Sequence, residues 1–585
     1  MAERAHWKSR LGFVLAAAGS AVGLGNIWKF PYITGENGGG LFVLIYLLCI
    51  LLVGLPIMMA EILIGRAAQK QPAGAFEVLE ERKTAWSTIG WMGVLTGFII
   101  LSYYSVVAGW AMDYTLKSII NFTEPIHKQA EAEAIEYRAT ASLETLRDDL
   151  IDHDLDSAMR AEQAQLRRQV PASTWQAYDR FRLAIANADD RDVARERLLS
   201  DPEMRQAVED SEKVENRITE LRREKEEELT AKYESMSEPE LLDAAETLKR
   251  RQVTYDKVSA AFGATAADGW GSAFWSLIFM VITIVIVAGG VSSGIERACQ
   301  LLMPTLCGLI LVMVLYGTTQ PGFERAFAFV FSPDPTKLKA SGVLEALGHA
   351  FFTLSLGMGA MITYGSYQDS KKGLLTESAM IALLDTLVAL MACLMIFPIV
   401  FSYGQEPGEG PGLVFMSMPL AFTEIGAGGM VLAIVFFGLL VFAALTSAIS
   451  LLEVVASYLI DQRDWSRPRA AWVTGIAIFL FGLPTAFSQG DSPLFPGWKP
   501  GYGVSFFDTM DILTSNWMLP LGGLLTAIYA GWVMPARLRD AEITDIPEIV
   551  KLGWIFMLRF ITPALVVIVL LQKVGILKID ELLVW

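Results

Sequence analysis

Two glycine-rich stretches inside apolar segments are the clearest candidates for binding chemistry in this chain, because they can leave peptide N–H and C=O groups unpaired. The first, Gly-Ser-Ala-Val-Gly-Leu-Gly, runs from Gly19 to Gly25 within a segment, Leu11 to Ile33, that is long enough to cross a bilayer. Each glycine costs a helix interior about 0.8–1 kcal/mol relative to alanine. Unwound backbone at membrane depth is tolerated only where it is buried in protein or lines a cavity. The stretch is therefore either a close helix–helix contact or a binding site built from exposed peptide groups.

The second stretch, Thr-Leu-Ser-Leu-Gly-Met-Gly, runs from Thr353 to Gly359 within another spanning segment, Ala346 to Tyr364. Two glycine-interrupted spans in corresponding halves of a chain indicate a transporter built from an internal repeat. In such a protein the substrate site lies between the two breaks, near the middle of the bilayer.

The composition is that of a membrane protein with many spans. Hydrophobic residues make up 53% of the 585 residues, and the mean hydropathy is +0.41, far too apolar for a soluble chain of this length. The apolar runs predict about eleven spans, which begin near Leu11, Leu41, Ile89, Ala273, Ala298, Ala346, Ala379, Met430, Ala471, Ile512 and Trp554. No cleavable signal peptide is expected, and the four cysteines, all in or beside spans, predict no disulfide framework.

Loop charges set the expected orientation. Lysine and arginine gather before the first span, after the second, and in the other loops on that same side, whereas Ser402 to Gly429 has none. The positive-inside rule therefore places the N-terminus in the cytoplasm and, with eleven spans, the C-terminus outside. We expect a multi-pass protein of the cell inner (plasma) membrane.

A polar insert separates the third and fourth spans. We expect membrane helices one to three in residues 1–120, the insert in 121–269, and helices four to eleven in 270–585. The insert holds about 34 acidic and about 22 basic residues, so it carries about −12 of the net charge of −16. Ser200-Asp201-Pro202-Glu203 and Ser237-Glu238-Pro239-Glu240 are typical helix starts, and Pro171 marks a break. We expect helices outside the membrane, serving either as a solvated cap or as a module for a protein partner or self-association; the acidic balance argues against nucleic acid.

Long gapless strings carry a resemblance to a known family. They are Arg4-Ala5-His6-Trp7, Gly19 through Pro31, Glu36-Asn37-Gly38-Gly39-Gly40, Phe351 through Gly359 with Tyr364 and Tyr367, and Ala443-Ala444-Leu445-Thr446-Ser447. On these residues the chain resembles the neurotransmitter:sodium symporters, most closely the bacterial members, in every span but not in the insert. The resemblance implies an all-α polytopic fold of the leucine-transporter type. This fold has two inverted five-helix repeats with broken first and sixth helices, followed by an eleventh span.

The resemblance also implies two sodium ions, held by oxygen donors at the helix breaks and on facing helices. The first site is expected at Ala21, Asn26, Thr353 and Asp385. The second is expected at Gly19, Val22, Ala443, Thr446 and Ser447. The alternative for the last two hydroxyls is that they bond only the carbonyls of their own helix.

Asp385 has a further expected role. A carboxylate at membrane depth is costly unless it is paired. The resemblance places the neighbours of a chloride site at Tyr46, His349, Thr353 and Ala389, and Ala389 offers neither a hydroxyl nor a carboxylate. We therefore expect Asp385 to supply the negative charge itself, and transport to need no chloride.

The substrate pocket follows from the same resemblance. A substrate carboxylate is expected on the N–H groups of Leu24 and Gly25, beside the hydroxyl of Tyr104. The rest of the pocket is expected at Ser20, Ala21, Ile100, Phe352, Thr353, Ser355, Met358, Ser447 and Leu451. Because none of these side chains is charged, a neutral, hydrophobic amino acid is the expected substrate. Gly23 stands where monoamine transporters carry an aspartate, which favours an intact amino acid over an amine.

Two charge pairs are expected to act as gates. Outside, Lys29 faces Asp511, with Tyr104 and Phe352 as an aromatic lid. Inside, Arg4 pairs with Asp461, with Trp7 packed below and Tyr367 hydrogen-bonded to the pair.

Three further side chains are interpreted with them. Glu61 is expected to accept hydrogen bonds from the unwound first and sixth spans. His349 is either a pH-sensitive neighbour of the outer gate or a neutral, hydrogen-bonded residue. For Glu453, pairing within the bundle, proton transfer and a place beside the second sodium remain open.

The sequence thus predicts a sodium-coupled symporter that imports a neutral, hydrophobic amino acid by alternating access. The alternative from another class is a non-transporting amino-acid sensor that signals through the insert, although the chain keeps both gates. An enzyme is not expected, because there is no metal motif and no nucleophile–base pair.

Overall fold

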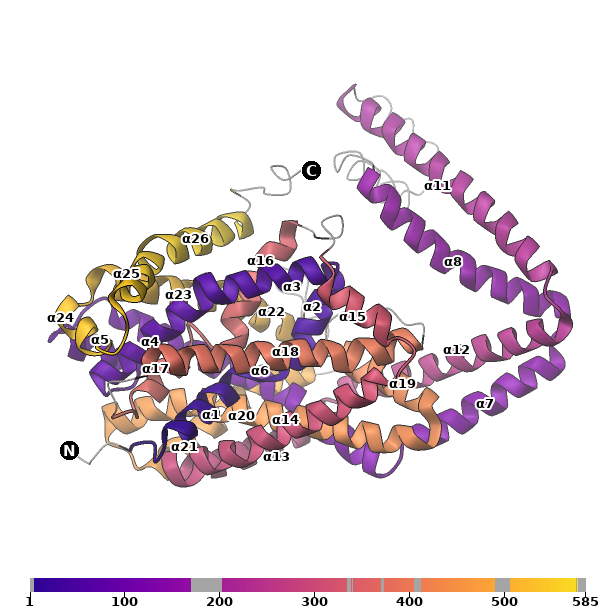
Figure 1. The fold of residues 1–585 in the computed structure, drawn as a ribbon. Helices are drawn as coiled ribbons and strands as arrows, with labels where there is room; N and C mark the ends of the chain where they lie inside the picture. Colours follow the sequence, from indigo (N-terminus) through magenta and orange to yellow (C-terminus); the bar gives the residue numbers. More distant parts are fainter. Residues whose placement is uncertain are drawn as a thin grey trace. The chain divides into compact units, whose positions relative to one another are not determined.

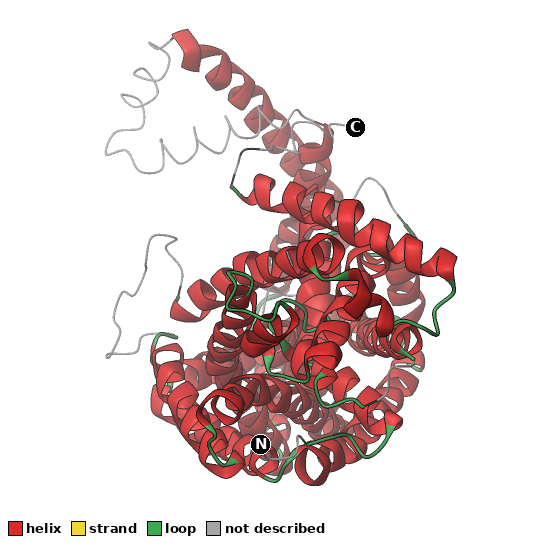
Figure 2. Cartoon of the chain, turned by 90° about the vertical axis from the view of Figure 1, so that its left-hand side faces the viewer, coloured by secondary structure: helices red, strands yellow, loops and turns green. Residues whose placement is uncertain are grey.

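The computed structural model describes residues 5–169, 202–333, 338, 340–369, 373–403, 412–489, 505–574 and 576. Every regular element in these ranges is a helix, and Figure 2 shows helices joined by short loops. The chain forms two compact units, one of Met1–Pro125 with Lys257–Trp585 and the other of Ile126–Asp256. The second unit falls within the predicted insert.

Eight helices of the first unit are long and apolar enough to cross a membrane. They are α3–α4 (Gly40–Ala68), α6 (Ser87–Ile119), α13 (Gly269–Ala288), η3–α14 (Val291–Thr318), α18 (Leu374–Ser402), α20 (Gly429–Arg463), α21 (Arg467–Phe487) and α25–α26 (Glu548–Lys573). A ninth span is bent by 50° between α1 (Arg10–Ala21) and Gly25–Glu36. The two other predicted spans correspond to the short helices α16 (Ala340–Thr353) and α17 (Ala360–Gly365), and to the stretch from α22 (Phe506–Asp511) to α23 (Leu519–Ile528).

The predicted breaks in the first and sixth spans are present. Helix α1 ends at Val22, whose backbone is extended, and a π-helical turn, η1 (Gly25–Lys29), leads into α2 (Phe30–Glu36). Between α16 and α17 the chain leaves the helix, with positive φ angles at Ser355 (54°), Gly357 (78°) and Gly359 (76°). Glycine is required at Gly357 by space as well as by φ, because an added Cβ would lie 2.3 Å from the carbonyl oxygen of Leu519.

Long helices hold the broken ones in place. Helices α6 and α20 pack along each other, and α1 lies against α14, α18 and α20. Figure 1 shows these helices running in roughly the same direction through the bundle. Shorter helices complete the unit: α5 (Pro72–Leu79), α15 (Phe323–Phe331), α19 (Met418–Ile425) and α24 (Ala536–Ala541).

The second unit consists of long polar helices: parts of α7 (Thr123–Thr140) and α12 (Glu238–Ala267), with α8 (Leu143–Gln169) and α11 (Pro202–Glu234). Leu146, Leu150, Tyr233 and Leu241 belong to its small apolar core. Both predicted helix starts are present, with Pro202 first in α11 and Ser237 donating to the Glu240 carboxylate before α12. The predicted break at Pro171 lies outside the described residues.

One carboxylate joins two helices of this unit. The Asp154 carboxylate accepts hydrogen bonds from the Tyr233 hydroxyl at 2.6 Å and the Lys232 ammonium at 3.0 Å. Burial raises the pKa of Asp154, but these two donors outweigh it and hold the pKa below its usual value. A carboxyl whose pKa is lowered by folding stabilises the fold above its unfolded pKa, and this contribution is lost as the pH falls through the folded value.

We therefore expect Asp154→Asn to loosen α8 and α11 at pH 7, where the ionised carboxylate contributes, and to have less effect as the pH falls through the lowered pKa of Asp154. Hydrogen–deuterium exchange at pH 7 should show faster exchange in these helices. The matched control is Asp152→Asn, which changes an exposed carboxylate two residues away. Equal exchange in the two variants would contradict the prediction.

Candidate functional site

The two helix breaks meet at a small cavity in the first unit. Its volume is about 20 Å³, close to the space that a single water needs. The cavity is lined by Ser20, Ala21, Gly23, Gly25, Ile100, Tyr104, Phe352, Thr353, Ser355, Met358, Ser447 and Leu451. All the residues predicted for the pocket are therefore in one place except Leu24, which lines the adjoining cavity towards Lys29 and Asp511.

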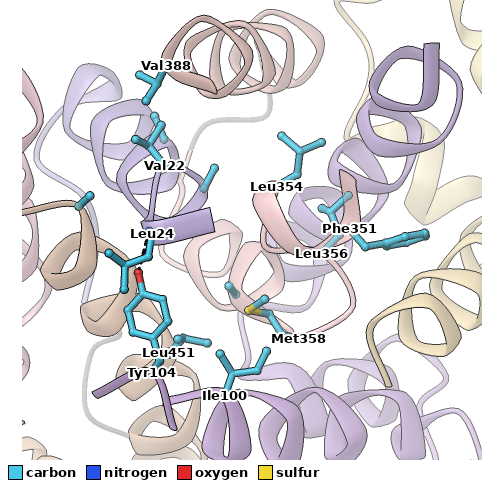
Figure 3. Close-up of a cluster of buried hydrophobic side chains, with 14 of the residues drawn as sticks. Val22, Leu24, Ile100, Tyr104, Phe351, Leu354, Leu356, Met358, Val388 and Leu451 are labelled. Atoms are coloured by element: carbon cyan, nitrogen blue, oxygen red, sulfur yellow. Dashed lines mark hydrogen bonds between the residues drawn. The ribbon is translucent and has the colours of Figure 1, made fainter. Parts of the chain in front are cut away.

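Tyr104 ties helix α6 to the break in α1. Its hydroxyl accepts a hydrogen bond from the Leu24 N–H at 3.2 Å, and Figure 3 shows it directed at Leu24, with Ile100, Met358 and Leu451 around the same space. Gly23 permits this approach, because an added Cβ would lie 2.4 Å from the Ser447 hydroxyl oxygen and 3.0 Å from that of Tyr104. An aspartate at this position would fill the cavity.

A chain of serine hydroxyls closes one side of the cavity. The Ser20 hydroxyl lies 2.7 Å from that of Ser450 and 3.2 Å from that of Ser355, and the Ser355 hydroxyl donates to the Ser20 carbonyl at 2.8 Å. The sequence prediction missed Ser450, which lies behind the lining residues. Its place four residues after Thr446, one helical turn along α20, was the available signal.

Asp385 collects donors from three other helices. Its carboxylate accepts hydrogen bonds from the Asn26 amide at 2.7 Å, the Thr353 hydroxyl at 2.8 Å and the Tyr46 hydroxyl at 3.3 Å. The Asn26 side-chain oxygen in turn accepts from the Gly23 N–H at 3.0 Å. Asn26, Thr353 and Asp385, three of the four residues predicted for the first sodium site, are thus in direct contact in the fully buried interior.

The residues predicted for the second sodium site also meet. The Thr446 hydroxyl lies 3.0 Å from the Ala443 carbonyl oxygen and 3.4 Å from that of Val22. The Ser447 hydroxyl lies 3.4 Å from the Gly19 carbonyl oxygen. Helix α20 therefore faces the end of α1 with hydroxyls and carbonyls. The Thr446 hydroxyl lies near carbonyls of its own helix and of the break. The geometry therefore fits both alternatives for this hydroxyl, a ligand of sodium or a hydrogen bond within its own helix.

The outer charge pair is formed. The Lys29 ammonium lies 3.1 Å from the Asp511 carboxylate and 4.8 Å from the centre of the Phe352 ring. Tyr103 and Ser515, which the sequence prediction did not assign to this gate, also donate to Asp511, at 3.2 and 2.8 Å. Phe352 and Tyr104 line the cavities on both sides of this point, so this route to the pocket is closed.

His349 lies beside this region with its ring packed rather than hydrogen-bonded. The ring stacks on Phe30 at 5.5 Å and lies 5.6 Å from the Tyr46 ring. Neither ring nitrogen has a hydrogen-bond partner within the described part of the chain. The alternative in which His349 is held by a hydrogen bond is therefore wrong for this arrangement. The neighbouring Phe30 and Tyr46 contact the His349 ring through their aromatic rings.

The opposite end of the bundle carries a second charged network. The Tyr367 hydroxyl donates to Glu453 at 2.5 Å, and Arg467 forms an ion pair with the same carboxylate at 2.7 Å. Glu453 thus pairs within the bundle, the first of the readings that the sequence left open. Arg467 is a gate-region residue that sequence reasoning missed.

The predicted inner gate is only partly described. Arg4 lies outside the described residues, so its pair with Asp461 stays a prediction. Asp461 accepts a hydrogen bond from the Gln71 N–H at 2.9 Å. Trp7 packs on Tyr364 and Tyr367, and its indole N–H donates to the Tyr364 carbonyl at 3.0 Å; its predicted place below the Arg4–Asp461 pair stays a prediction.

Two buried glutamates support the breaks. Glu61 accepts a hydrogen bond from the Gly357 N–H at 2.7 Å, which is the predicted contact with the sixth span. Glu296, which was not predicted, accepts from the Lys8 N–H at 2.9 Å and the Ser9 hydroxyl at 3.0 Å, and so anchors the start of α1 on α14. No group of three or more His, Cys, Asp or Glu side chains in the described ranges has the arrangement of a transition-metal site.

Comparisons with known proteins agree with this geometry. The model of the sodium:neurotransmitter symporter family matches residues 4–157 and 215–582. An uncharacterized sodium-dependent transporter, YhdH of Bacillus subtilis, is 30% identical, with 98% of each chain covered. A sodium-dependent nutrient amino acid transporter of Drosophila simulans is 24% identical over 82% of this chain and 66% of its own length.

A solved structure is similar over the same extent. The crystal structure of MhsT in complex with L-phenylalanine superposes with a TM-score of 0.70 at 35% identity and covers 97% of this chain and 100% of its own. The likeness bears out the predicted fold, all-helical and polytopic with broken first and sixth helices. These relatives are transporters and not enzymes. The family model also matches residues 121–157 and 215–269 of the predicted insert, so the expectation that the resemblance excludes the whole insert is wrong. On this match the chain belongs to the sodium:neurotransmitter symporter family, whose members are sodium-dependent membrane transporters.

Proposed function

We propose that this transporter imports a neutral, hydrophobic amino acid together with sodium, by alternating access and without chloride. One observation carries the proposal: the uncharged cavity lies at the meeting point of the two helix breaks, between the two clusters of oxygen donors. Unpaired peptide groups at helix breaks suit the charged ends of an amino acid, and the oxygen clusters suit sodium.

The oxygen clusters support two sodium sites. Ala21, Asn26, Thr353 and Asp385 would hold one ion beside the substrate, and Gly19, Val22, Ala443, Thr446 and Ser447 the other. In each cluster, hydroxyl groups now within 2.8–3.4 Å of acceptor oxygens could turn their lone pairs towards an ion. Asp385 supplies a full negative charge at the first site, and this is the physical reason to expect chloride independence.

The cavity lining supports a hydrophobic substrate. Ile100, Met358 and Leu451 face the cavity, and no charged side chain lines it. Met358 is unbranched, so it adapts to side chains of different shapes, and it lies between two glycines with positive φ. The similar protein MhsT was crystallised with L-phenylalanine, so we include aromatic amino acids in the class. Because the cavity is only about 20 Å³, it must widen to admit any of them.

The gates support alternating access. The outer pair, Lys29 with Asp511, is closed, and at the other end Trp7 and the Glu453 network lie packed together. We propose that sodium and substrate bind when the outer pair opens, and that their joint binding favours the state in which the inner network releases. A ligand shifts such an equilibrium only by its different affinity for the two states. From the loop charges we propose that the N-terminus lies in the cytoplasm, and the insert and the C-terminus outside.

The first experiment measures binding of a panel of radiolabelled amino acids to the purified full chain, with sodium and then with potassium. Sodium-dependent binding of one or a few hydrophobic amino acids supports the proposal. Flux in liposomes then separates a symporter from a sensor, because a sensor binds without transport. No binding of any amino acid would contradict the pocket assignment.

Tyr104→Phe should weaken substrate binding about tenfold, because it removes one hydrogen-bonding hydroxyl from the expected carboxylate site. The matched control is Tyr103→Phe, which removes the neighbouring hydroxyl that reaches Asp511 instead of the cavity. Its substrate affinity should change less than about threefold. Equal losses in the two variants, measured by scintillation proximity binding at saturating sodium, would refute the assigned role of Tyr104.

A further inference from the structure

One positive charge in the last span takes no part in the transport site. Arg559 is at the centre of η8 (Met557–Ile561), a π-helical turn between α25 (Glu548–Phe556) and α26 (Thr562–Lys573). It lies eight residues beyond Lys551, or roughly 12 Å along the helix, in a 26-residue segment otherwise apolar enough to cross the membrane. Charged side chains at such depth need a partner, and they mark functional sites by default.

Arg559 is held by hydrogen bonds to a second π-helical turn, η7 (Tyr529–Val533). Its Nε donates to the Gly531 carbonyl at 2.6 Å, and the Trp532 indole N–H donates back to the Arg559 carbonyl at 3.2 Å. Gly531 permits the close approach, because an added Cβ would lie 3.2 Å from the Arg559 side chain. The guanidinium lies over the Trp532 ring, 5.0 Å from its centre. The geometry fixes the orientation of the guanidinium without neutralising it.

No carboxylate of the described residues pairs with this guanidinium. The acidic groups of this region are engaged elsewhere: Lys551 lies 3.2 Å from Asp540 and 3.5 Å from Glu548, and Arg539 also contacts Asp540. A guanidinium has five N–H donors, and only the one on Nε is used within the described chain. The donors that the described residues leave unused can therefore receive an anion from outside the protein.

The surroundings indicate where that anion comes from. Trp532, Phe556 and Phe560 are about half exposed, at 55%, 54% and 50%. The Phe560 ring contacts the rings of both Trp532 and Phe556. Such large apolar surface on a spanning helix faces lipid. Gly531 is three residues before the end of its helix at Met534, so the guanidinium lies within reach of the membrane interface, where tryptophan is favoured. Helices α25 and α26, yellow in Figure 1, run along the outside of the bundle.

We propose that Arg559, held by Gly531 and stacked on Trp532, binds the phosphate of an anionic phospholipid. Two guanidinium nitrogens can grip two phosphate oxygens side by side, which a lysine ammonium cannot do. The exposed rings of Phe556 and Phe560 cover the upper acyl chains. The lipid thereby supplies the counter-charge that the last span lacks.

Native mass spectrometry of the full chain in detergent tests this, with phosphatidylglycerol and phosphatidylcholine offered at equal concentration. The wild-type chain should retain phosphatidylglycerol in preference. Arg559→Gln should lower the phosphatidylglycerol-bound fraction about fivefold, the effect of one basic residue at a membrane surface. Arg559→Lys should fall between the two. The matched control is Arg469→Gln, because the Arg469 guanidinium also lies over a tryptophan, 4.3 Å from the centre of the Trp465 ring. This variant should retain as much phosphatidylglycerol as the wild type does.

The proposal is overturned if Arg559→Gln retains as much phosphatidylglycerol as the wild type, or if Arg469→Gln loses as much as Arg559→Gln. Inorganic phosphate is added as a competitor, and displacement of the lipid at millimolar phosphate would assign the site to a free anion instead. If Arg559→Gln does not fold, as judged by gel filtration, Arg559→Lys and Trp532→Phe decide the matter: wild-type lipid retention in both would refute the site.

Discussion

Replacing Asp385 with asparagine is expected to weaken sodium-dependent amino-acid binding by about 100- to 4,000-fold. Removing one partner of a buried charged pair costs about 3–5 kcal/mol, and each 1.4 kcal/mol is a factor of ten in affinity. Asparagine keeps the shape of the side chain but removes the negative charge that faces the proposed sodium ion. It also turns an amide NH₂ towards donors: the Asn26 amide and the Thr353 and Tyr46 hydroxyls all donate to this carboxylate.

The measurement is a titration of sodium at fixed radiolabelled substrate, which separates a loss of sodium affinity from a loss of the fold. Asp113→Asn is the matched control, because that carboxylate pairs with Lys117 one turn along α6 and away from the cavity. Its sodium affinity should stay within about twofold of the wild type, as expected for a pair within one helix. An Asp385→Asn protein with unchanged sodium affinity would remove Asp385 from the ion site.

Chloride independence rests on the same carboxylate. Uptake by the wild-type protein should be unchanged when gluconate replaces chloride, because Asp385 already provides the negative charge and Ala389 offers an anion no hydrogen bond. Loss of uptake in gluconate would show that the buried carboxylate does not offset the sodium charge.

The cavity could be predicted closely from the sequence because most of its residues occur in short continuous stretches of the chain. The cost of glycines inside an apolar segment predicts the breaks at Gly19–Gly25 and Thr353–Gly359, and the structure shows both. The resemblance to the symporter family then implies which side chains face the breaks. Ser450 was missed because it does not line the cavity itself and hydrogen-bonds to the lining residues Ser20 and Ser447.

The contacts that hold the bundle together could not be predicted in the same way. Glu296 and Ser9 are 287 residues apart, and Glu453 and Arg467 lie on different helices, so no spacing in the sequence connects them. The number of spans shows a related limit. Hydropathy predicts about eleven, whereas eight helices, or nine with the bent first span, pass a test of length and apolarity in the described residues. The two remaining spans contain only short α-helices, α16 and α17 in one and α22 and α23 in the other, and none of these is long enough by itself to cross the membrane.

Another unpredicted contact between residues far apart in the chain leads to the largest expected effect on stability. Arg66, at the end of α4, forms an ion pair with Glu542 at 2.7 Å and also donates to its carbonyl. The two side chains are only 1% and 5% exposed, and they lie 476 residues apart in the chain. The pair joins α4 to the connection that follows α24, and so fixes the last spans on the first ones.

Arg66→Met should therefore lower the free energy of unfolding by about 3–5 kcal/mol, because it removes one partner of a buried ion pair and takes the Arg66 charge away from the Glu542 carboxylate. The double variant Arg66→Met/Glu542→Met should recover most of this loss, since replacing a buried ion pair with apolar side chains is often neutral or stabilising. Lys117→Met is the control: its half-exposed pair with Asp113 should contribute less than about 1 kcal/mol. Thermal unfolding in detergent should show the largest loss of stability for Arg66→Met, a smaller loss for the double variant and the smallest for Lys117→Met. If the double variant were as unstable as Arg66→Met, the loss would come from the packing of the arginine side chain and not from the removal of its charge beside Glu542.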